Sequence, residues 1–179
     1  LYASDHSTVT NNTCNNNSGD GILLEYSGVS MVEDNTCKNN NLRGIYIYES
    51  DYCEVTNNIL QENVGYGVSL STISNYNLIH HNNFVDNNLV GTSQGYDDGT
   101  NNYWYDTLTL EGNYYNDWSG TGSYAIDGAA GVTDLYPLDE PTVYLGPPVI
   151  TNIIHSPSSP TELDTISINA TVTSPHGVY

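Results

Sequence analysis

Basic residues are almost absent from this chain. Its 179 residues include 21 aspartates and glutamates but only one lysine, Lys38, and one arginine, Arg43, so the net charge is -19. Nucleic-acid affinity depends on neutralising phosphates with lysine and arginine, and a field this negative also repels anionic head groups. The composition therefore excludes nucleic acid as a partner. Neutral polar side chains, mainly asparagine, serine and threonine, must cover most of the surface.

Long hydrophobic runs are absent as well. No apolar stretch approaches the roughly 18 residues that a membrane-spanning helix requires, and we expect no membrane insertion of this fragment. No charged segment followed by an apolar one opens the chain as a signal peptide would. The only methionine is Met31, so we expect the natural N-terminus to lie upstream.

A repeat of about 23 residues is the strongest feature of the sequence. A glycine column is followed each time by two alternating apolar residues, which in the first repeat are Ile22 and Leu24. Alternation of this kind predicts short strands with one face turned inward, about four inward side chains per repeat. The glycine column reads Gly21, Gly44, Gly67 and, after a one-residue insertion, Gly91; two further apolar columns read Val9, Val32, Val55, Ile79 and Cys14, Cys37, Leu60, Val85.

Asparagine columns accompany the apolar ones. Asparagine tolerates the left-handed bends between strands, and amides stacked about 4.8 Å apart can hydrogen-bond along the stack. The repeat therefore predicts an all-β fold, a parallel β-helix with about 23 residues per coil. A leucine-rich repeat has a similar period, but its leucine-rich signature and helical return are not visible. The two columns read Asn12, Asn35, Asn58, Asn83 and Asn17, Asn40, Asn63, Asn88.

The chain divides into four expected segments. Leu1 falls in the column of Leu24, so we expect the chain to begin within a coil, with earlier coils missing. An atypical, aromatic-rich unit is the usual way to cover the open core of a repeat array. The expected segments are β-helix coils at 1–94, a capping region at 95–136, a proline-rich linker at 137–148, and the first strands of an incomplete immunoglobulin- or fibronectin-like β-sandwich at 149–179.

Several motifs carry a resemblance to a known family. They include Gly-Ile-Tyr-Ile-Tyr at 44–48, His-Asn-Asn-Phe at 81–84 and Gly-Asn-Tyr-Tyr at 112–115. Residues 1–138 resemble the right-handed parallel β-helix repeat proteins of the NosD-like type, within the pectate-lyase-like superfold. The resemblance implies a secreted or surface-anchored protein of archaea or bacteria, often followed by immunoglobulin-like domains. A copper-linked description attaches to part of that family, but the histidines of this chain share no column and no ligand spacing, so we carry no copper site over.

Catalytic constellations known for this superfold are not apparent. A polysaccharide lyase needs a strong base and cations that neutralise the uronate, and the chain has only two basic residues. Arg43 shares a column with Asp20, which predicts an ion pair between neighbouring coils. We interpret Glu49, Asp51 and Glu54 as a solvated edge rather than the paired carboxylates of a glycosidase. A lyase or hydrolase stays an alternative if its active site lies in missing coils, so the sequence leans against an enzyme without deciding it.

Four tyrosines are candidate sugar contacts. Tyr46 and Tyr48 project from one face of a strand, and Tyr52 is expected to stack near Tyr76 in the next coil. Tyrosine combines a flat apolar face with a polar tip, which suits sugar rings. Tyrosine is also a favoured strand residue, and this explanation stays open.

Calcium is the only cofactor for which the sequence offers candidate ligands. Asp97, Asp98 and Asp117 could bind calcium if the fold gathers them. Carboxylates that initiate turns are the alternative explanation.

Glycosylation and cysteine chemistry leave further possibilities. The Asn-x-Ser/Thr pattern occurs at Asn11, Asn16 and Asn169, which are glycosylation candidates in an exported protein. Cys14 and Cys37 stack in one inward column, either as buried thiols or as a disulfide. Cysteine usage therefore does not fix the redox compartment.

The sequence favours a non-catalytic structural or adhesive module, extracellular or on the cell surface. Its expected partners are polysaccharide, a neighbouring surface protein, or further copies of itself in a surface layer or filament. A carbohydrate-binding module is the alternative function. Loss of glycan affinity on replacing the four tyrosines would distinguish it from a purely structural role.

Overall fold

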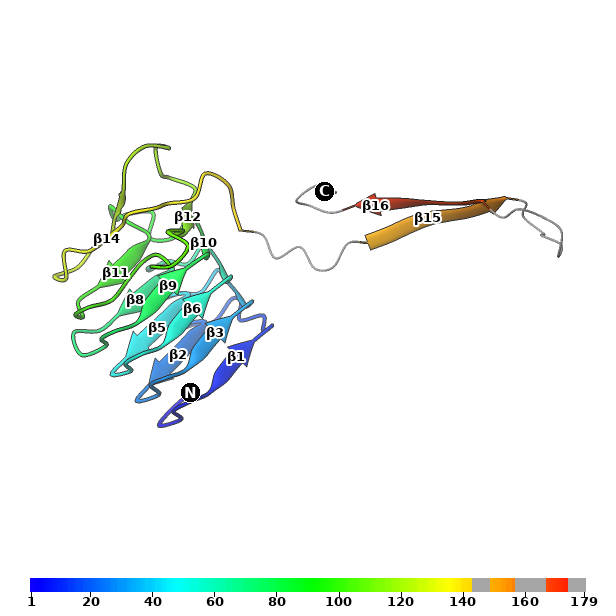
Figure 1. Cartoon of the computed structure of the whole chain (residues 1–179). Helices are drawn as coiled ribbons and strands as arrows, with labels where there is room; N and C mark the ends of the chain where they lie inside the picture. The colour runs from blue at the N-terminus through cyan, green and yellow to red at the C-terminus, as the bar shows by residue number, and fades with distance from the viewer. Residues whose placement is uncertain (143–148, 157–166, 174–179) are drawn as a thin grey trace. The chain divides into compact units, whose positions relative to one another are not determined.

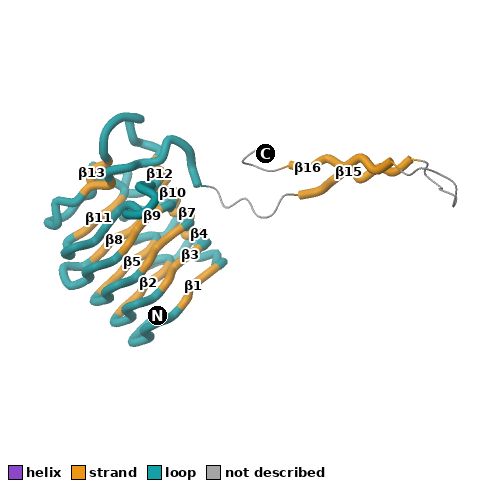
Figure 2. Tube along the Cα trace, in the orientation of Figure 1, coloured by secondary structure: helices purple, strands orange, loops and turns teal. Residues whose placement is uncertain are grey.

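The computed structural model describes residues 1–142, 149–156 and 167–173, which fall into two compact units, Leu1–Thr142 and Val143–Tyr179. Strands are the only regular elements among these residues. In the first unit they follow one another around a coil that advances along one axis (Figures 1 and 2). The all-β class and the parallel β-helix predicted from the repeat are confirmed.

Three parallel sheets of four strands form the walls of the coil. The first contains β2 (Ile22–Glu25), β5 (Ile45–Tyr48), β8 (Val68–Leu70) and β11 (Gly95–Asp97). The second contains β1 (Thr8–Thr10), β3 (Met31–Glu33), β6 (Glu54–Thr56) and β9 (Leu78–His80). The third contains β4 (Thr36–Lys38), β7 (Ile59–Gln61), β10 (Asn83–Val85) and β12 (Tyr114–Tyr115).

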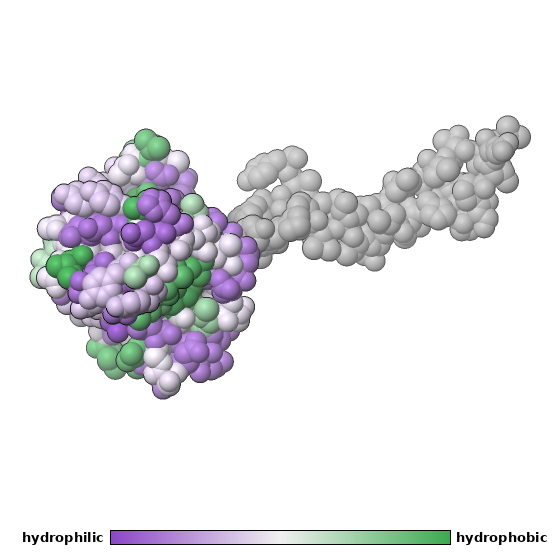
Figure 3. Space-filling view, turned by 90° about the horizontal axis from the view of Figure 1, so that it is seen from below, coloured by the Kyte–Doolittle hydropathy of each residue, from purple (hydrophilic) through white to green (hydrophobic). Residues whose placement is uncertain are grey.

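The apolar columns fill the interior as expected. Ile22 pairs with Ile45, and Ile45 pairs with Val68, so equivalent residues 23 apart lie directly above one another. All three side chains are buried. Burying about four aliphatic side chains contributes on the order of 6 to 12 kcal/mol per coil. The face seen from below in Figure 3 is mainly hydrophilic or weakly polar, with several hydrophobic patches among the polar residues.

Left-handed residues mark the corners of the coil. One corner is formed by Asn11, Asp34, Asn57 and His81, whose φ angles lie between 55° and 57°. Most residues avoid this conformation because Cβ crowds the following carbonyl, whereas asparagine, aspartate and histidine adopt it more readily. The other three corner columns are Ala3, Tyr26, Glu49; His6, Val29, Tyr52, Tyr76, Asn101; and Asn16, Asn39, Glu62, Asp86.

An asparagine ladder runs along the interior next to the apolar columns. The side-chain oxygen of Asn58 accepts the backbone N–H and the amide N–H of Asn35, at 2.9 and 3.0 Å. The amide of Asn58 in turn donates to Asn82, Val32 and Thr56. The same pattern repeats from coil to coil, so the predicted amide stacking is confirmed.

The column assignments in the fourth repeat were wrong by one or more residues. The spacing becomes 24 after the turn at Ser71–Ser74, which puts Asn82, Phe84 and Asn87 in the columns assigned to Asn83, Val85 and Asn88. A longer loop then displaces Gly91 from the glycine column, and Gln94 takes its position, because the residue that follows it, Gly95, pairs with Val68. The columns were misassigned because asparagine occurs in pairs here, at Asn82-Asn83 and at Asn87-Asn88, and either member of each pair fits the repeat.

Strands of neighbouring coils continue to pair within residues 95–136, the segment expected to be a cap. β11 pairs with β8, and β12 pairs with β10. A last turn adds bridges from Tyr96 to Asp127 and from Tyr114 to Leu138, and β13 (Tyr124–Ala125) and β14 (Thr133–Asp134) form a small antiparallel pair. Large rings fill the core at this end: the Tyr115 ring stacks on Tyr124 at 3.7 Å and on Phe84 at 4.9 Å.

The second unit contains one described pair of strands. β15 (Val149–Ser156) and β16 (Ser167–Thr173) pair in antiparallel orientation. The β-sandwich expected at 149–179 stays a prediction, and the second half of the proline-rich linker, residues 143–148, lies outside the described residues. Within the described ranges, no helix has the length and apolar character needed to cross a bilayer.

Candidate functional site: a tyrosine corner and a histidine pair

Two exposed tyrosines stack on each other at one corner of the coil. The rings of Tyr52 and Tyr76 are nearly parallel, with an interplanar angle of 5° and centroids 5.0 Å apart. Their residues are 60% and 50% exposed. The stacking expected from the sequence is therefore confirmed, and the two rings form one exposed aromatic stack at this corner.

Strand propensity does not explain these two tyrosines, because neither lies in a strand. Both have left-handed backbones, with φ of 57° for Tyr52 and 58° for Tyr76. That conformation costs an L-residue roughly 1–2 kcal/mol, and asparagine, which occupies the same corner at Asn101, tolerates it better. Val29 also occupies this corner, so the position does not demand an aromatic ring. Tyrosine is thus held where the backbone does not favour it and where its ring is exposed.

A groove lies on each side of the stacked pair. One groove, of about 330 Å³, is lined by Tyr26, Val29, Tyr52 and the acidic residues Asp5, Glu49 and Asp51. The other, of about 410 Å³, is lined by Tyr76, Asn77, Leu78, Asn101, Tyr103 and Thr107. The aromatic surface and the two grooves together follow the direction in which the coils stack.

Tyr46 and Tyr48 make a second, less open aromatic pair on β5. Their ring centroids are 5.8 Å apart. The guanidinium of Arg43 lies 3.6 Å from the centroid of the Tyr46 ring and pairs with Asp20 at 2.8 Å. The ion pair predicted between coils is confirmed, and it covers one face of Tyr46. Of the four tyrosine candidates, Tyr52 and Tyr76 are the better placed for a ligand.

His80 and His81 face each other at the end of β9. Their Nδ1 atoms are 2.6 Å apart. The Nε2 of His80 lies 3.0 Å from Glu54, and the Nε2 of His81 lies 2.8 Å from Glu111. Analysis by columns missed this cluster because its members come from different coils; the His-His doublet at a corner was the available signal.

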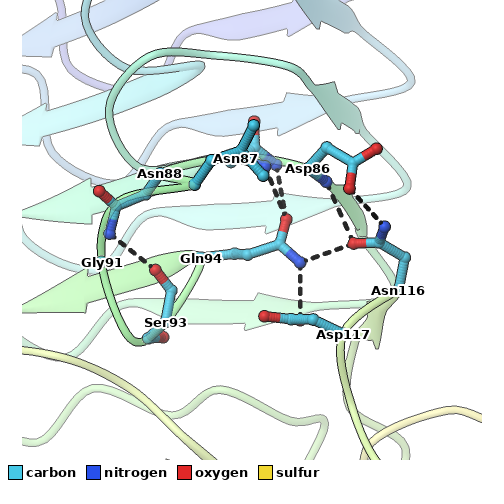
Figure 4. Close-up of a pocket in the computed structure, with 9 residues that line it drawn as sticks. Asp86, Asn87, Asn88, Gly91, Ser93, Gln94, Asn116 and Asp117 are labelled. Carbon is cyan, nitrogen blue, oxygen red and sulfur yellow. Dashed lines mark hydrogen bonds between the residues drawn. The ribbon is translucent and has the colours of Figure 1, made fainter.

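A polar pocket of about 240 Å³ lies beside the longer loop of the fourth repeat (Figure 4). Gln94 is at its centre and donates to Asn116 and Asp117, at 2.9 and 2.7 Å. Its side-chain oxygen accepts from the backbone and amide of Asn87. The lining groups thus bond to one another, and Gln94 acts as the structural end of an asparagine column.

The three aspartates considered as candidate calcium ligands have separate partners. Asp97 is fully buried and accepts from the Trp104 indole, the Asn102 amide and the Gly99 N–H. Asp98 accepts from the Ala129 N–H, and Asp117 accepts from Gln94. Among the described residues, no three His, Cys, Asp or Glu side chains are grouped to hold a metal ion.

Two carboxyl groups with raised pKa values lie in the interior rather than in a cleft. Burial raises the pKa of Asp97 and raises the pKa of Asp134 to about 6. Both side chains are fully buried and hydrogen-bonded to the surrounding coil. Their ionisation therefore bears on stability rather than on a reaction.

The remaining candidates are placed as follows. Asn11 and Asn16 are exposed at left-handed corners, and Asn169 lies in β16 opposite Ile154. Glycosylation at these positions stays a prediction. Cys14 and Cys37 are free thiols, and burial raises the pKa of Cys37 far above its usual range.

Comparison with known proteins identifies one family. The family described as "Periplasmic copper-binding protein (NosD)" matches residues 1–120 of the 179. A search of curated proteins found no significant match, and neither did a search of solved structures. The periplasmic description agrees at a coarse level with the expected location outside the cytoplasm. Because the match covers more than half of the chain and the coils have the expected architecture, the chain belongs to the NosD family of right-handed parallel β-helix proteins.

Proposed function

We propose that this chain is a non-catalytic binding module of the periplasm or cell surface that adheres to polysaccharide through the tyrosine corner. The observation that carries the proposal is the stacked, exposed pair Tyr52–Tyr76. A sugar ring has an apolar face that packs on an aromatic ring and hydroxyls that bond to polar groups at its rim. Preformed aromatic surfaces lose little conformational entropy on binding.

The grooves beside the pair support a polymeric rather than a monomeric ligand. They continue the aromatic surface on both sides, with Tyr26 in one and Tyr103 in the other.

The charge of the chain narrows the class of glycan that we propose as ligand. The chain carries a net charge of -19, and one groove contains Asp5, Glu49 and Asp51. A field of this sign repels uronic or sulfated glycans, so the proposed ligand is a neutral or amino-sugar polymer.

The test replaces each tyrosine by the residue that its corner prefers. Tyr52→Asn and Tyr76→Asn remove the rings while keeping a side chain that suits the left-handed backbone. Affinity electrophoresis against a panel of neutral, amino and acidic polysaccharides should show retardation of the unmodified chain by neutral or amino-sugar polymers only. Each substitution should weaken that retardation at least tenfold.

Leu89→Ala is the control, because Leu89 is an exposed apolar residue that lines neither groove. It should leave binding unchanged. Equal retardation of the chain and both asparagine variants would contradict the proposal. Ordered arrays formed by the purified chain without any glycan would instead support a structural role.

Copper is a second candidate ligand, because the description of the family names it. The observation that favours it is the pair of facing nitrogens on His80 and His81, since imidazole is a donor type that suits copper. Equilibrium dialysis of the chain against Cu²⁺ tests this candidate. Bound copper approaching one ion per chain is expected, and its absence would contradict copper binding.

A further inference from the structure

We infer that two adjoining pockets beside the longer loop of the fourth repeat form a docking site for another protein. The occupant is an extended segment in which an apolar side chain and a lysine or arginine lie two residues apart. The inference goes beyond the proposed glycan binding, because none of the residues that line these pockets lines the grooves at the tyrosine corner.

The first pocket, of about 250 Å³, has a mainly apolar lining. Val64, Leu89 and Val90 supply it and are 66%, 78% and 97% exposed. Single exposed apolar residues are ordinary on protein surfaces, whereas several that gather in one hollow mark a binding site. The hollow is smaller than the roughly 300–1,000 Å³ of sites for drug-sized ligands. It therefore suits one apolar side chain of a partner.

Two of these three apolar residues belong to an insertion in the repeat. Leu89 and Val90 lie in the loop between Asn87 and Gln94, which has six residues. The corresponding loop of the preceding coil, 64–66, has three. The longer loop turns apolar side chains toward solvent instead of adding them to the core. Packing of the coil does not explain why they are apolar.

The second pocket is the polar one shown in Figure 4, and it shares a wall with the first. Asp86 and Leu89 line both pockets. The carboxylates of Asp86 and Asp117 are exposed in the second pocket. A carboxylate can accept about four hydrogen bonds, and among the described residues one donor, the Asn116 amide at 2.8 Å, bonds to the Asp86 side chain. The pocket therefore has acceptor capacity left for a cationic donor.

The charges around the pockets select a basic partner. Glu62 adds a third carboxylate, and none of the described residues lining either pocket is basic. A second copy of the chain would be repelled, because each copy has a net charge of -19. Its only arginine, Arg43, is already paired with Asp20. A polysaccharide has no aliphatic or aromatic side chain for the apolar pocket, so the occupant is a different protein.

The shared wall sets the spacing of the two side chains in the partner. In an extended segment, side chains two residues apart point the same way and are about 6.6 Å apart. Adjoining pockets that share Asp86 and Leu89 suit this separation. The lysine or arginine would form charge-assisted hydrogen bonds with Asp86 and Asp117, while the apolar side chain would pack on Val64 and Val90.

The coil supplies substitutions that preserve its backbone. Asp86 occupies a left-handed corner that is filled by Asn39 in an earlier coil, so Asp86→Asn removes the charge and keeps a residue suited to the corner. The N–H of Val64 donates to the preceding coil in the same way as that of Asn41. Val64→Asn therefore removes the apolar side chain and places a residue already found in this column. Leu89→Ala truncates an exposed loop residue.

Asp34→Asn is the matched control for charge. It removes one carboxylate from a different left-handed corner, whose column contains Asn57. Tyr52→Asn is the control for independence, because it should weaken glycan binding and leave protein binding unchanged.

The experiment titrates the isotope-labelled full chain with short peptides and records nuclear magnetic resonance spectra. Peptides that carry Leu-Thr-Lys, Phe-Thr-Lys or Phe-Thr-Arg should perturb the signals of Val64, Asp86 and Leu89. Peptides with Ser-Thr-Lys or Leu-Thr-Glu in their place should bind about tenfold more weakly, because each lacks one of the two side chains. Asp86→Asn, Val64→Asn and Leu89→Ala should each weaken binding about tenfold as well, and Asp34→Asn should not. Thermal melting confirms that each variant is folded.

Several outcomes would overturn the inference. One is the absence of any perturbation by the three apolar–basic peptides at millimolar concentration. Equal affinity for the serine peptide would show that the acidic pocket binds cations without the apolar one. Sedimentation that shows a dimer abolished by Leu89→Ala would assign the surface to a second copy. If a variant does not fold, the peptide series on the unmodified chain decides the matter. The peptides contain no sugar, so their failure to bind leaves the glycan proposal intact.

Discussion

The carboxylate of Asp134 accepts the backbone N–H of Asn113 at 2.7 Å, in the position that an asparagine amide oxygen fills in the preceding coils. It also accepts the amide of Asn113 and the backbone N–H of Tyr136. The asparagine ladder thus ends on an ionisable group. A carboxyl group is therefore buried in the interior at the place where the repeat ends.

The first prediction concerns the pH dependence of stability. Burial raises the pKa of Asp134 from 3.8 to about 6. A raised native pKa means that the folded state holds the proton more tightly, so this contribution is fully present below about pH 4 and is lost as the pH rises through 6. The shift corresponds to about 3 kcal/mol.

Asp134→Asn should remove this pH dependence, although it also loses the hydrogen bond from the Tyr136 N–H. Urea unfolding at pH 4 to 7 gives the free energy of unfolding of the variant and of the unmodified chain. The difference, variant minus unmodified chain, should increase as the pH rises. A difference that stays constant over this range would contradict the raised pKa of Asp134.

A second prediction separates stability from binding at the tyrosine corner. Tyr52→Asn should stabilise the coil by about 0.5–1 kcal/mol, because asparagine tolerates the left-handed backbone better than tyrosine. The same variant is expected to lose glycan affinity. Thermal unfolding and affinity electrophoresis measure the two effects on one sample. A loss of stability together with affinity would mean that the ring serves packing instead.

The third prediction tests the asparagine ladder. Asn58 is fully buried and its amide takes part in bonds to five groups in three coils. Asn58→Ala leaves several of those groups unpaired and should cost about 3–5 kcal/mol. Asn12→Ala, at an exposed position of the same column, should cost less than 1 kcal/mol. Similar losses in the free energy of unfolding of the two variants, measured by chemical denaturation, would show that the contribution of a ladder asparagine does not depend on its burial.

A fourth prediction concerns the glycine column. A Cβ on Gly44 would lie 2.6 Å from the carbonyl oxygen of Gly67, which belongs to the next coil. Gly44→Ala should therefore force adjacent coils apart and cost about 1–3 kcal/mol. Gly19→Ala is the control, because nothing lies within 4 Å of a Cβ there. Equal melting temperatures for the two variants would refute this packing argument.

The sequence determined the coil more fully than the site. Columns such as Val9, Val32 and Val55 are readable because a parallel stack repeats one environment at a fixed interval. The register failed where one residue was inserted near Ser74, since neighbouring asparagines fit two alignments equally well. His81 and Glu111 were not connected because the second lies in a turn outside the repeat, and only the folded chain brings them together.

Corner residues of this coil recur at the spacing of stacked strands, about 4.8 Å, as Tyr52 and Tyr76 do. Duplication of one repeat would insert another corner into the same row without altering the core contacts of its neighbours. This row of corner residues would therefore lengthen one step at a time during evolution, and the length of the proposed glycan site would be set by the number of repeats rather than by new binding residues.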